Sequence, residues 1–434
     1  MSDVRRIRLG NNTSKKDSGV VEDIPVKWRR SQDHHAAFNR LNEWELQDEL
    51  EEVNERWKNW KRGRLVESGL ALFDLVGKPR GHLFGDPIAV FTMRDGGELP
   101  WHKFTHGDIV IISRSRPWDE KIVEGVVLDR SRKRLRVVCG DLPEGLRKGA
   151  WRLDRGANRV AHDRMQDALE SFHSMEGSNG TVLQNVLLAN LHDLDASAAM
   201  LPELGPMKRK LQTATLDGLN LNESQKEAIS QCVTRRLSLI QGPPGTGKTH
   251  TAVQLVKVWT RQQTGPILAC ADSNVAVDNL VEGLLNVGVH VVRIGRPVKV
   301  REELRSATLD ALVEEHPDRE EVKMMIDDVM LMKRELGDLR GKERGLAHRD
   351  ISKGWKEIRK LEQRIIDDIL NRADVICTTC IGAGHPVLGD RKFPHVLIDE
   401  ATQATEPASL VPIVRGARQL VLVGDHHQLP ATVI

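Results

Sequence analysis

The sequence has no tyrosine, only five cysteines in 434 residues, and no apolar run near the ~20 residues that a membrane helix needs. So few cysteines exclude a disulfide framework and favour a reducing compartment, for which we expect the cytoplasm, the nucleus or both. The first residues, MSDVRRIRLGNNTSKKDSG, contain arginine but no apolar core. We therefore expect residues 1–37 to form a disordered basic tail and not a secretory signal, and we expect no membrane partner.

The sequence also lacks a large excess of charge of either sign. Lysine and arginine number 64 and aspartate and glutamate 62, which leaves a net charge of +2. This balance excludes binding through an overall positive charge, as in histone-like proteins, but a local basic groove could still bind nucleic acid. The length of 434 residues predicts about two to four domains.

Two helical stripes flank a β-rich stretch within residues 38–175. The first starts from Phe38, ends near Gly63 and spaces its apolar residues four, three, four and three apart: Leu46, Leu50, Val53, Trp57 and Trp60. The second stripe is Ala161, Met165, Ala168 and Phe172. Between them, short β-rich runs separated by Gly, Pro and Asp predict a small antiparallel barrel or sandwich. We predict a helical stalk that carries a small barrel, followed by a linker over residues 176–205.

Residues 206–434 have the alternating pattern of an α/β domain. Six mostly continuous apolar runs are strand candidates: 237–241, 266–271, 289–295, 374–380, 395–400 and 419–425. Helical segments separate several of these runs, which predicts a doubly wound parallel sheet.

One interval of the α/β domain, residues 300–372, contains no strand candidate. It carries two apolar stripes at helical spacing, which begin at Val322 and Ile351, with Gly341 and Gly345 between them. This predicts an inserted helical hairpin whose stripes pack on each other. A coiled coil that binds a partner is the alternative.

A phosphate-binding loop follows the strand candidate at 237–241 and precedes an apolar helix. It has the complete GxxxxGK[ST] pattern: Gly242, Pro243, Pro244, Gly245, Thr246, Gly247, Lys248 and Thr249. The glycines allow backbone N–H groups to point at phosphate oxygens. Lys248 places a cation at the β- and γ-phosphates, and Thr249 offers a hydroxyl to Mg²⁺.

Two further positions fit the same chemistry. The run HVLIDE ends in Asp399 and Glu400, at the sheet edge where ligands of α/β proteins bind. We assign Asp399 to the Mg²⁺ shell and Glu400 to the attacking water. Gln225, just before the first strand, has an amide that can donate to and accept from the N6/N7 edge of adenine, which predicts ATP as the nucleotide.

Gln428 lies after the last strand candidate, beside the predicted Asp399 strand. An amide there can contact the γ-phosphate and change partners when the phosphate leaves, so we predict a sensor. The neighbouring His426 and His427 could indicate a metal site. We favour solvated turn histidines, because adjacent side chains of an extended segment point in opposite directions.

Polar loops at the same sheet edge predict a nucleic-acid track. We assign sugar–phosphate contacts to Ser273, Asn274 and Thr379, whose side chains cannot read base sequence in that position. In the barrel, the basic run at 130–136 is equally consistent with a nucleic-acid contact and with a charged hairpin face. Cys377 and Cys380 form one CxxC without the second ligand pair of a zinc site.

These motifs, in this order, resemble the superfamily 1 helicases of the Upf-like group, which contains the nonsense-mediated-decay and immunoglobulin mu-binding helicases. LNESQ, GPPGTGKT, SNVAVDNL, IDEATQATEP and GDHHQLP resemble its Q motif and motifs I, Ia, II and III. TCIGAG and EATQATEP are closer to the decay helicase. RIGRPVKVREELRSATLDALV and FTHGDIV are closer to the mu-binding branch, which we favour.

The resemblance implies an α/β, RecA-like P-loop NTPase domain with a helical-hairpin insertion, preceded by a helical stalk and small antiparallel β-barrel. It also implies ATP and Mg²⁺ as cofactors, and 5′–3′ movement of a monomer along single-stranded RNA or DNA, with protein regulators left open. It supports catalytic roles for Lys248, Asp399, Glu400 and Gln428. Asp272 departs from the family, which commonly has proline there, and its charge should repel a nearby phosphate unless it points away.

The family has a second RecA-like domain after motif III, whose arginines reach the γ-phosphate and can contribute ~10³-fold to phosphoryl transfer. This sequence ends at Ile434, and we expect that domain to be absent and turnover by this chain to be weak. Three readings follow. The chain is the first part of an ATP-dependent helicase, a module that binds nucleotide and single strands with little turnover, or an ATPase switch completed by another chain.

Overall fold

The structure is a computed structural model. It describes residues 4–5, 24–25, 31–83, 86–105, 107–117, 122–157, 159–174, 180–188, 219–262, 265–295, 302–336 and 339–433. The chain divides into two compact units. The first contains residues 1–44, 163–299 and 374–433, and the second contains residues 45–162 and 300–373. Most of the predicted tail and linker lies outside the described residues, and the predicted domain boundaries stay predictions.

A six-stranded parallel sheet forms the centre of the first unit. Its strand order is β11-β12-β10-β13-β14-β9. The strands are β9 (Leu237–Gln241), β10 (Ile267–Ala271), β11 (Val291–Arg293), β12 (Val375–Thr379), β13 (His395–Asp399) and β14 (Gln419–Gly424). All six predicted strands are confirmed, because their apolar runs are long enough to be buried on both faces.

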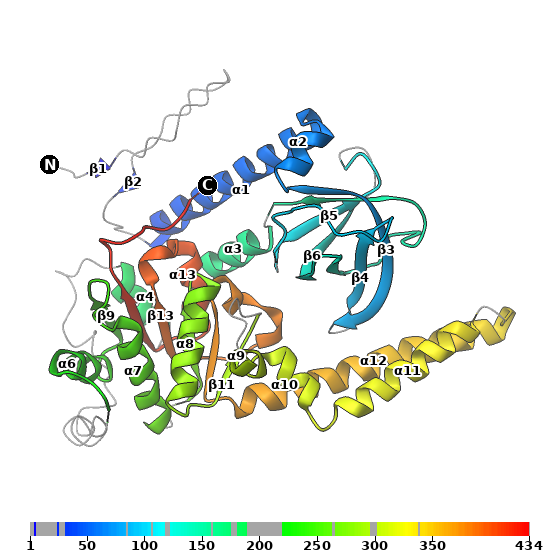
Figure 1. Ribbon diagram of the computed structural model, residues 1–434. Coiled ribbons are helices and arrows are strands. Elements are labelled where there is room, and N and C mark those ends of the chain that lie inside the picture. The colour runs from blue at the N-terminus through cyan, green and yellow to red at the C-terminus, as the bar shows by residue number, and fades with distance from the viewer. Residues whose placement is uncertain are drawn as a thin grey trace. The chain divides into compact units, whose positions relative to one another are not determined.

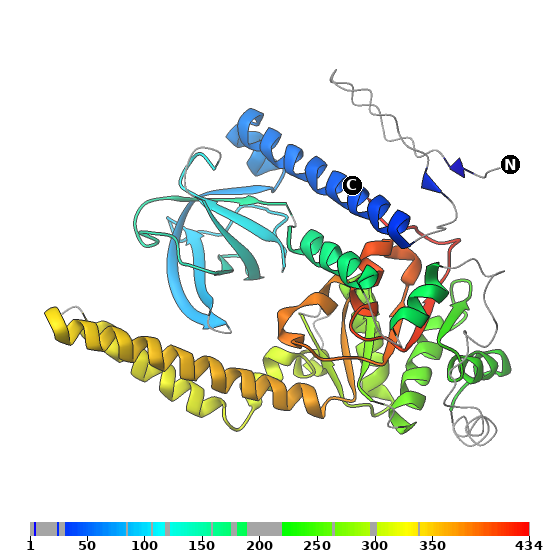
Figure 2. The ribbon, with the colours of Figure 1, turned by 180° about the vertical axis from the view of Figure 1, so that it is seen from behind.

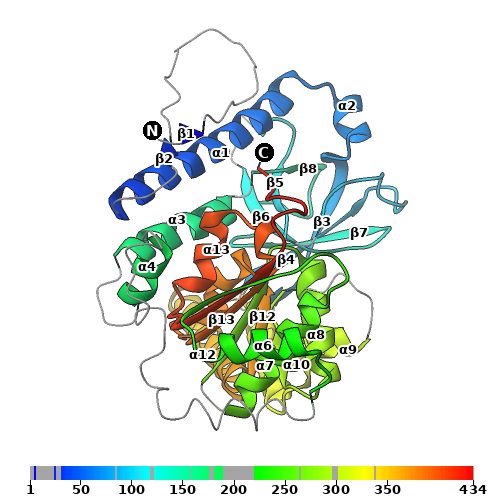
Figure 3. The ribbon, with the colours of Figure 1, turned by 90° about the vertical axis from the view of Figure 1, so that its left-hand side faces the viewer.

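Helices cover both faces of this sheet. Helices α7 (Lys248–Gln262) and α8 (Asn274–Asn286) lie on one face, and α13 (Glu406–Ile413) lies on the other (Figures 1 and 3). The strands β10 and β13 are buried along their whole length between these layers. The short α6 (Glu223–Cys232) precedes β9, and its start carries the predicted nucleotide-binding Gln225.

The second unit contains a closed six-stranded antiparallel barrel, so the fold class is confirmed (Figure 2). Its strand order is β3-β4-β7-β6-β5-β8. The strands are β3 (Ala71–Leu83), β4 (Asp86–Met93), β5 (Ile109–Ser113), β6 (Val123–Arg130), β7 (Arg134–Cys139) and β8 (Trp151–Arg155). Residues that include Leu75, Phe91, Phe104 and Val110 fill its interior.

The sequence did not identify β3 and β8 as strands. β3 contains Gly77, Pro79 and Gly81, which are usual turn residues, and its register shifts between Pro79 and His82. β8 carries Arg152 and Asp154, yet both are buried, because Arg152 Nε donates to Asp154 Oδ2 at 2.6 Å. The paired charges are buried together with Trp151 and Leu153, so burial does not alternate along this short strand.

The stalk helices begin and end at other residues than the stripes predicted. Helix α1 is Ser31–Asn59, so it starts seven residues before Phe38, inside the range predicted to be a disordered tail. Gly63 does not end it, because a second helix, α2 (Arg62–Glu67), contains that glycine. Helix α3 (Arg159–His173) buries Ala168, Leu169 and Phe172, and α4 (Gly180–Leu188) follows.

The predicted hairpin is present as two long helices, α11 (Arg319–Glu335) and α12 (Gly341–Arg372) (Figure 2). The short α9 (Glu302–Ser306) and α10 (Leu309–Glu315) precede it. Val322, Val329, Ile358 and Ile365 are buried in this region, so the two stripes pack as predicted. Among the described helices, none is long and apolar enough to cross a membrane.

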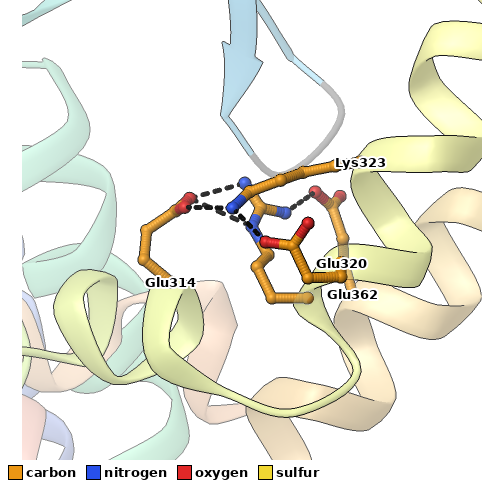
Figure 4. A network of polar contacts seen from close by, with 5 residues as sticks. Glu314, Glu320, Lys323 and Glu362 are labelled. Carbon is orange, nitrogen blue, oxygen red and sulfur yellow. Dashed lines mark hydrogen bonds and ion pairs between the residues drawn. The ribbon is translucent and has the colours of Figure 1, made fainter.

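A charged network holds the base of the hairpin together. Arg319 donates to Glu314 at 2.6 Å and to Glu362 at 3.3 Å, which joins α10, α11 and α12. Figure 4 shows Glu314, Glu320, Lys323 and Glu362 converging around this point. Glu362 is largely buried, and burial raises the pKa of its carboxyl. Arg319 therefore stabilises a carboxylate that water reaches poorly.

We expect Arg319→Ala to lower the free energy of unfolding by about 3 kcal/mol, because it leaves the buried Glu362 carboxylate without its cation. Denaturant unfolding monitored by circular dichroism measures this change. Lys323→Ala is the matched control. Its side chain is 45% exposed, so its ion pairs should contribute below about 1 kcal/mol. Equal losses in the two variants would contradict the prediction.

Candidate nucleotide-binding site

The phosphate-binding loop lies between the end of β9 and the start of α7, as its pattern predicts. Gly245 and Gly247 both have φ of +80°, a conformation that side chains rarely adopt. The loop is held from within, since Thr246 Oγ1 donates to the Pro243 carbonyl at 2.7 Å. Lys248 Nζ donates to the Gly242 carbonyl at 2.9 Å, so the ammonium is folded over the loop where phosphates would lie.

The two predicted Mg²⁺ ligands lie in direct contact. Thr249 Oγ1 donates to Asp399 Oδ2 at 2.9 Å, across 150 residues of sequence. The register explains this contact. β14 lies between β9 and β13, so the carboxyl ends of all three strands meet at one edge. A hydroxyl and a carboxylate side by side are hard oxygen ligands, which Mg²⁺ prefers.

The environment of Asp399 disfavours its negative charge. The residue is 1% exposed, and burial raises the pKa of its carboxyl to about 6, with Glu400 adding to the shift. In an unfolded chain the same carboxyl titrates near ~3.9. Between pH ~3.9 and about 6, the native state binds more protons than the unfolded chain. The stability that the Asp399 carboxyl contributes is therefore fully present below pH ~3.9. It is lost as the pH rises through about 6.

We expect Asp399→Asn to raise the thermal stability of the metal-free chain at pH 8. The amide still accepts from Thr249 but carries no buried charge. The gain should be about 1–3 kcal/mol, and it should shrink as the pH falls to 5, where wild-type Asp399 is largely protonated. Thermal unfolding curves across this pH range measure it. A gain that is independent of pH would contradict the assigned pKa.

Glu400 has a backbone conformation that is unusual for its residue type. Its φ is 51° and its ψ is 39°, the left-handed region, which costs about 1–2 kcal/mol for a residue with a Cβ. Its Oε2 accepts from Gln403 Nε2 at 3.4 Å, and its backbone N–H donates to Asp399 Oδ1 at 3.1 Å. Strain of this kind persists where function requires a side-chain position, which suits a carboxylate that must orient water.

Gln225 is the third residue of α6 and lies against the phosphate-binding loop. It forms a capping box with Asn222, in which Gln225 Oε1 accepts from the Asn222 N–H at 3.1 Å. Its Nε2 donates to the Thr246 carbonyl at 3.1 Å. An amide offers two N–H groups and two oxygen lone pairs, so one of each stays available for adenine. The predicted adenine contact stays a prediction.

Gln428 lies in a tight turn after β14, where its side chain donates to Asp425 Oδ2 at 3.0 Å. The sequence argument about His426 and His427 was wrong in its geometry. Because these residues are in a turn and not extended, their rings lie on the same side with centroids 3.9 Å apart. In the described ranges, no group of three His, Cys, Asp or Glu side chains is arranged to hold a metal ion.

The sequence analysis missed two contacts that join this turn to the rest of the site. Gln241 Nε2, at the end of β9, lies 3.0 Å from His426 Nδ1. Thr402 Oγ1, two residues after Glu400, donates to the Asp425 carbonyl at 3.3 Å. The Gln428 turn is therefore tied to the strand before the phosphate loop and to the turn after β13, as a phosphate sensor needs to be.

The three predicted nucleic-acid residues also meet at this edge, because Ala271 pairs with Thr379 on one side and with Asp399 on the other. Each has a local structural partner. Ser273 caps α8, Thr379 Oγ1 accepts from the Gly382 N–H at 3.0 Å, and Asn274 Oδ1 accepts from Arg293 at 2.8 Å.

Arg293 was not predicted, and it is 1% exposed beneath the start of α8. It pairs with Asp278, which is also buried, at 3.3 Å. This pair and the Arg293–Asn274 contact fix the first turn of α8 against β11, so the position of Asn274 depends on it.

Other predicted features have more local roles. In the 130–136 run, Arg130 donates to the carbonyls of His102 and Phe104, and Arg136 pairs with Asp129. These two side chains make hydrogen bonds within the barrel, while Arg132 and Lys133 are exposed.

Cys377 and Cys380 are free and buried, and burial raises the pKa of both thiols. The charge of Asp272 adds to the shift at Cys380, which places that carboxylate beside β12.

Comparison with known proteins gives consistent matches. The family model described as an AAA domain matches residues 220–434. The chain is 38% identical over 276 residues to ATP-dependent helicase NAM7 of Saccharomyces cerevisiae, a match that covers 63% of this chain and 26% of that protein. It is 30% identical over 403 residues to DNA polymerase alpha-associated DNA helicase A of Schizosaccharomyces pombe, which covers 89% of this chain and 59% of that protein.

A third relative is DNA-binding protein SMUBP-2 of Mus musculus, 32% identical over 402 residues, covering 88% of this chain and 39% of that protein. The chain therefore spans between about a quarter and three-fifths of the length of these relatives. The matches to helicase A and to SMUBP-2 cover more of the chain than the match to NAM7 does.

Proposed function

Because the chain belongs to the superfamily 1 helicases of the Upf-like group, we propose that it binds ATP with Mg²⁺ and couples hydrolysis to movement along single-stranded nucleic acid. The observation that carries this proposal is the 2.9 Å hydrogen bond between Thr249 and Asp399. It brings the phosphate-binding loop and the acidic strand end together at one sheet edge, which is the arrangement that phosphoryl transfer to water requires.

Each side chain then has a distinct role. Lys248 leaves the Gly242 carbonyl to contact the β- and γ-phosphates, and Thr249 and Asp399 hold the Mg²⁺ shell. Glu400 orients the attacking water from its left-handed position. Gln428 reports the γ-phosphate through the turn that Thr402 and Gln241 hold. Gln225 reads adenine with the part of its amide that the capping box leaves available.

Ser273 and Asn274, which follow β10, and Thr379, at the end of β12, provide the track for the sugar–phosphate backbone, one and two strands from the catalytic carboxylates. We propose 5′–3′ movement and membership of the mu-binding branch. The branch proposal is supported by the wide coverage of the match to SMUBP-2, whose name describes it as DNA-binding. We also propose that the chain acts as a monomer, in the cytoplasm or the nucleus.

Titration of the chain with a fluorescent ATP analogue, with and without Mg²⁺, tests the proposal directly. We expect micromolar binding that requires Mg²⁺, and tighter binding of adenine than of guanine nucleotides. Hydrolysis measured with single-stranded RNA and with single-stranded DNA then identifies the strand. Absence of Mg²⁺-dependent nucleotide binding by the folded chain would refute the proposed function.

A further inference from the structure

Two histidines from the stalk helices connect to the helix that follows the catalytic pair. His34 of α1 is fully buried, and its Nε2 lies 2.6 Å from Glu406 Oε1. Its Nδ1 lies 3.0 Å from His173 Nε2 of α3. With both rings neutral, His173 donates to His34 and His34 donates to Glu406, so one tautomer of each ring satisfies the whole chain of hydrogen bonds.

Glu406 is close to the catalytic pair along the chain. It is the first residue of α13, and Thr405 caps that helix. Only the short turn η4 (Ala401–Gln403) and two further residues separate it from Glu400. The backbone N–H of Gln403 donates to the Glu400 carbonyl at 3.0 Å, which keeps this segment tight. A shift of Glu406 would therefore move the turn that positions Glu400.

Helix α3 also contacts the loop after β12, which follows the predicted nucleic-acid residue Thr379. Arg164 donates to the Ile381 carbonyl at 3.1 Å, and a Cβ added at Gly384 would lie 2.9 Å from the Arg164 side chain. On the next residue of the helix, Met165 Sδ lies 3.9 Å from Thr405 Oγ1. Figures 1 and 3 show α3 between α1 and α13. One helix thus holds the turn of the ATP site and a loop of the nucleic-acid track.

We propose that α1 and α3 form a bracket that couples nucleotide binding to strand binding, and that His34 is the positioning residue that locks it. This inference rests on the proposed function and concerns how the same nucleotide-binding site is regulated. His34 contacts neither ligand. It acts through Glu406 on the catalytic turn, while Arg164 carries the same movement to the loop after β12.

The low pKa of His173 keeps the hydrogen bond between His173 and His34 in place at neutral pH. Burial, with the nearby His34 and His35, lowers the pKa of His173 to about 4. A neutral His173 donates to His34 without placing a positive charge beside it. Glu406 accepts the hydrogen bond from His34, and its side chain is half exposed.

The test measures a coupling factor, the ratio of the Kd for a single-stranded oligonucleotide without and with a non-hydrolysable ATP analogue and Mg²⁺. For His34→Ala and Glu406→Ala we expect this factor to fall at least about 5-fold towards one, the lower end of typical coupling. The Kd for nucleotide alone should change less than about 3-fold. His34→Gln keeps a donor for Glu406 and should restore most of the coupling.

Glu43→Gln, on the exposed face of α1, is the matched control, and thermal unfolding verifies that each variant is folded. A wild-type factor of one, or a factor unchanged in folded His34→Ala, would overturn the bracket while leaving the nucleotide site intact. Loss of nucleotide binding in wild type would instead refute the proposed function, and the bracket with it. Should His34→Ala not fold, Glu406→Ala decides, because it removes the acceptor from the other side, and an unchanged coupling factor in it would overturn the bracket.

Discussion

Lys248→Ala is expected to weaken binding of an ATP analogue by about 10–100-fold, the loss of one to two charged hydrogen bonds. The ammonium already lies over the loop, 2.9 Å from the Gly242 carbonyl, so it reaches the phosphates without a large rearrangement. Alanine leaves the backbone N–H groups of the loop in place but removes the cation at the β- and γ-phosphates. Fluorescence titration with and without Mg²⁺ measures the change.

The matched control for this variant is Lys257→Ala, in the same helix and away from the loop. It should leave the affinity for nucleotide unchanged. Equal affinities in wild type and Lys248→Ala would show that the nucleotide does not lie on this loop.

Glu400→Gln is expected to slow hydrolysis by about 10²–10⁴-fold, the usual contribution of a general base, while nucleotide affinity stays near that of wild type. The amide can still accept from Gln403, so the side chain keeps its position and loses only its ability to take a proton. Single-turnover hydrolysis with excess protein separates this chemical step from binding.

Asp374→Asn provides the comparison for this second variant. Asp374 lies at the opposite end of the strands, where its carboxylate accepts from the His290 N–H at 3.3 Å. The Asp374→Asn variant should hydrolyse ATP at the wild-type rate. If Glu400→Gln did so as well, another group would have to orient the water.

The sequence could predict the parts of this fold that have strong local patterns. The parallel strands are continuous apolar runs, and the phosphate loop has a fixed spacing of glycines and lysine, so both were identified to within one or two residues. β3 and the start of α1 were not identified. Gly77 and Pro79 in β3 resemble a turn, and the polar residues from Ser31 to His35 are helical because of tertiary contacts such as His34 with Glu406.

In the candidate site, the sequence identified the residues but not their partners. Thr402, Arg293 and His34 could not be found from spacing, because each acts through a contact with a distant segment that only the folded chain brings close. His426 and His427 are exposed turn residues, as predicted, but the argument from alternating side-chain directions failed for a related reason. Alternation of side chains holds for extended chain, and the residues after Gly424 form a turn.

The strand order of the sheet has a consequence for the synthesis of the protein. Among the described residues, β9 pairs only with β14, so the strand that leads into the phosphate loop pairs with a strand made much later in the chain. In the barrel, by contrast, β4 pairs with β3, which directly precedes it in the chain. During translation the barrel can fold early, while β9 waits for the segment around Leu420 to leave the ribosome. A nascent chain therefore completes the candidate nucleotide-binding edge late, after the barrel can fold.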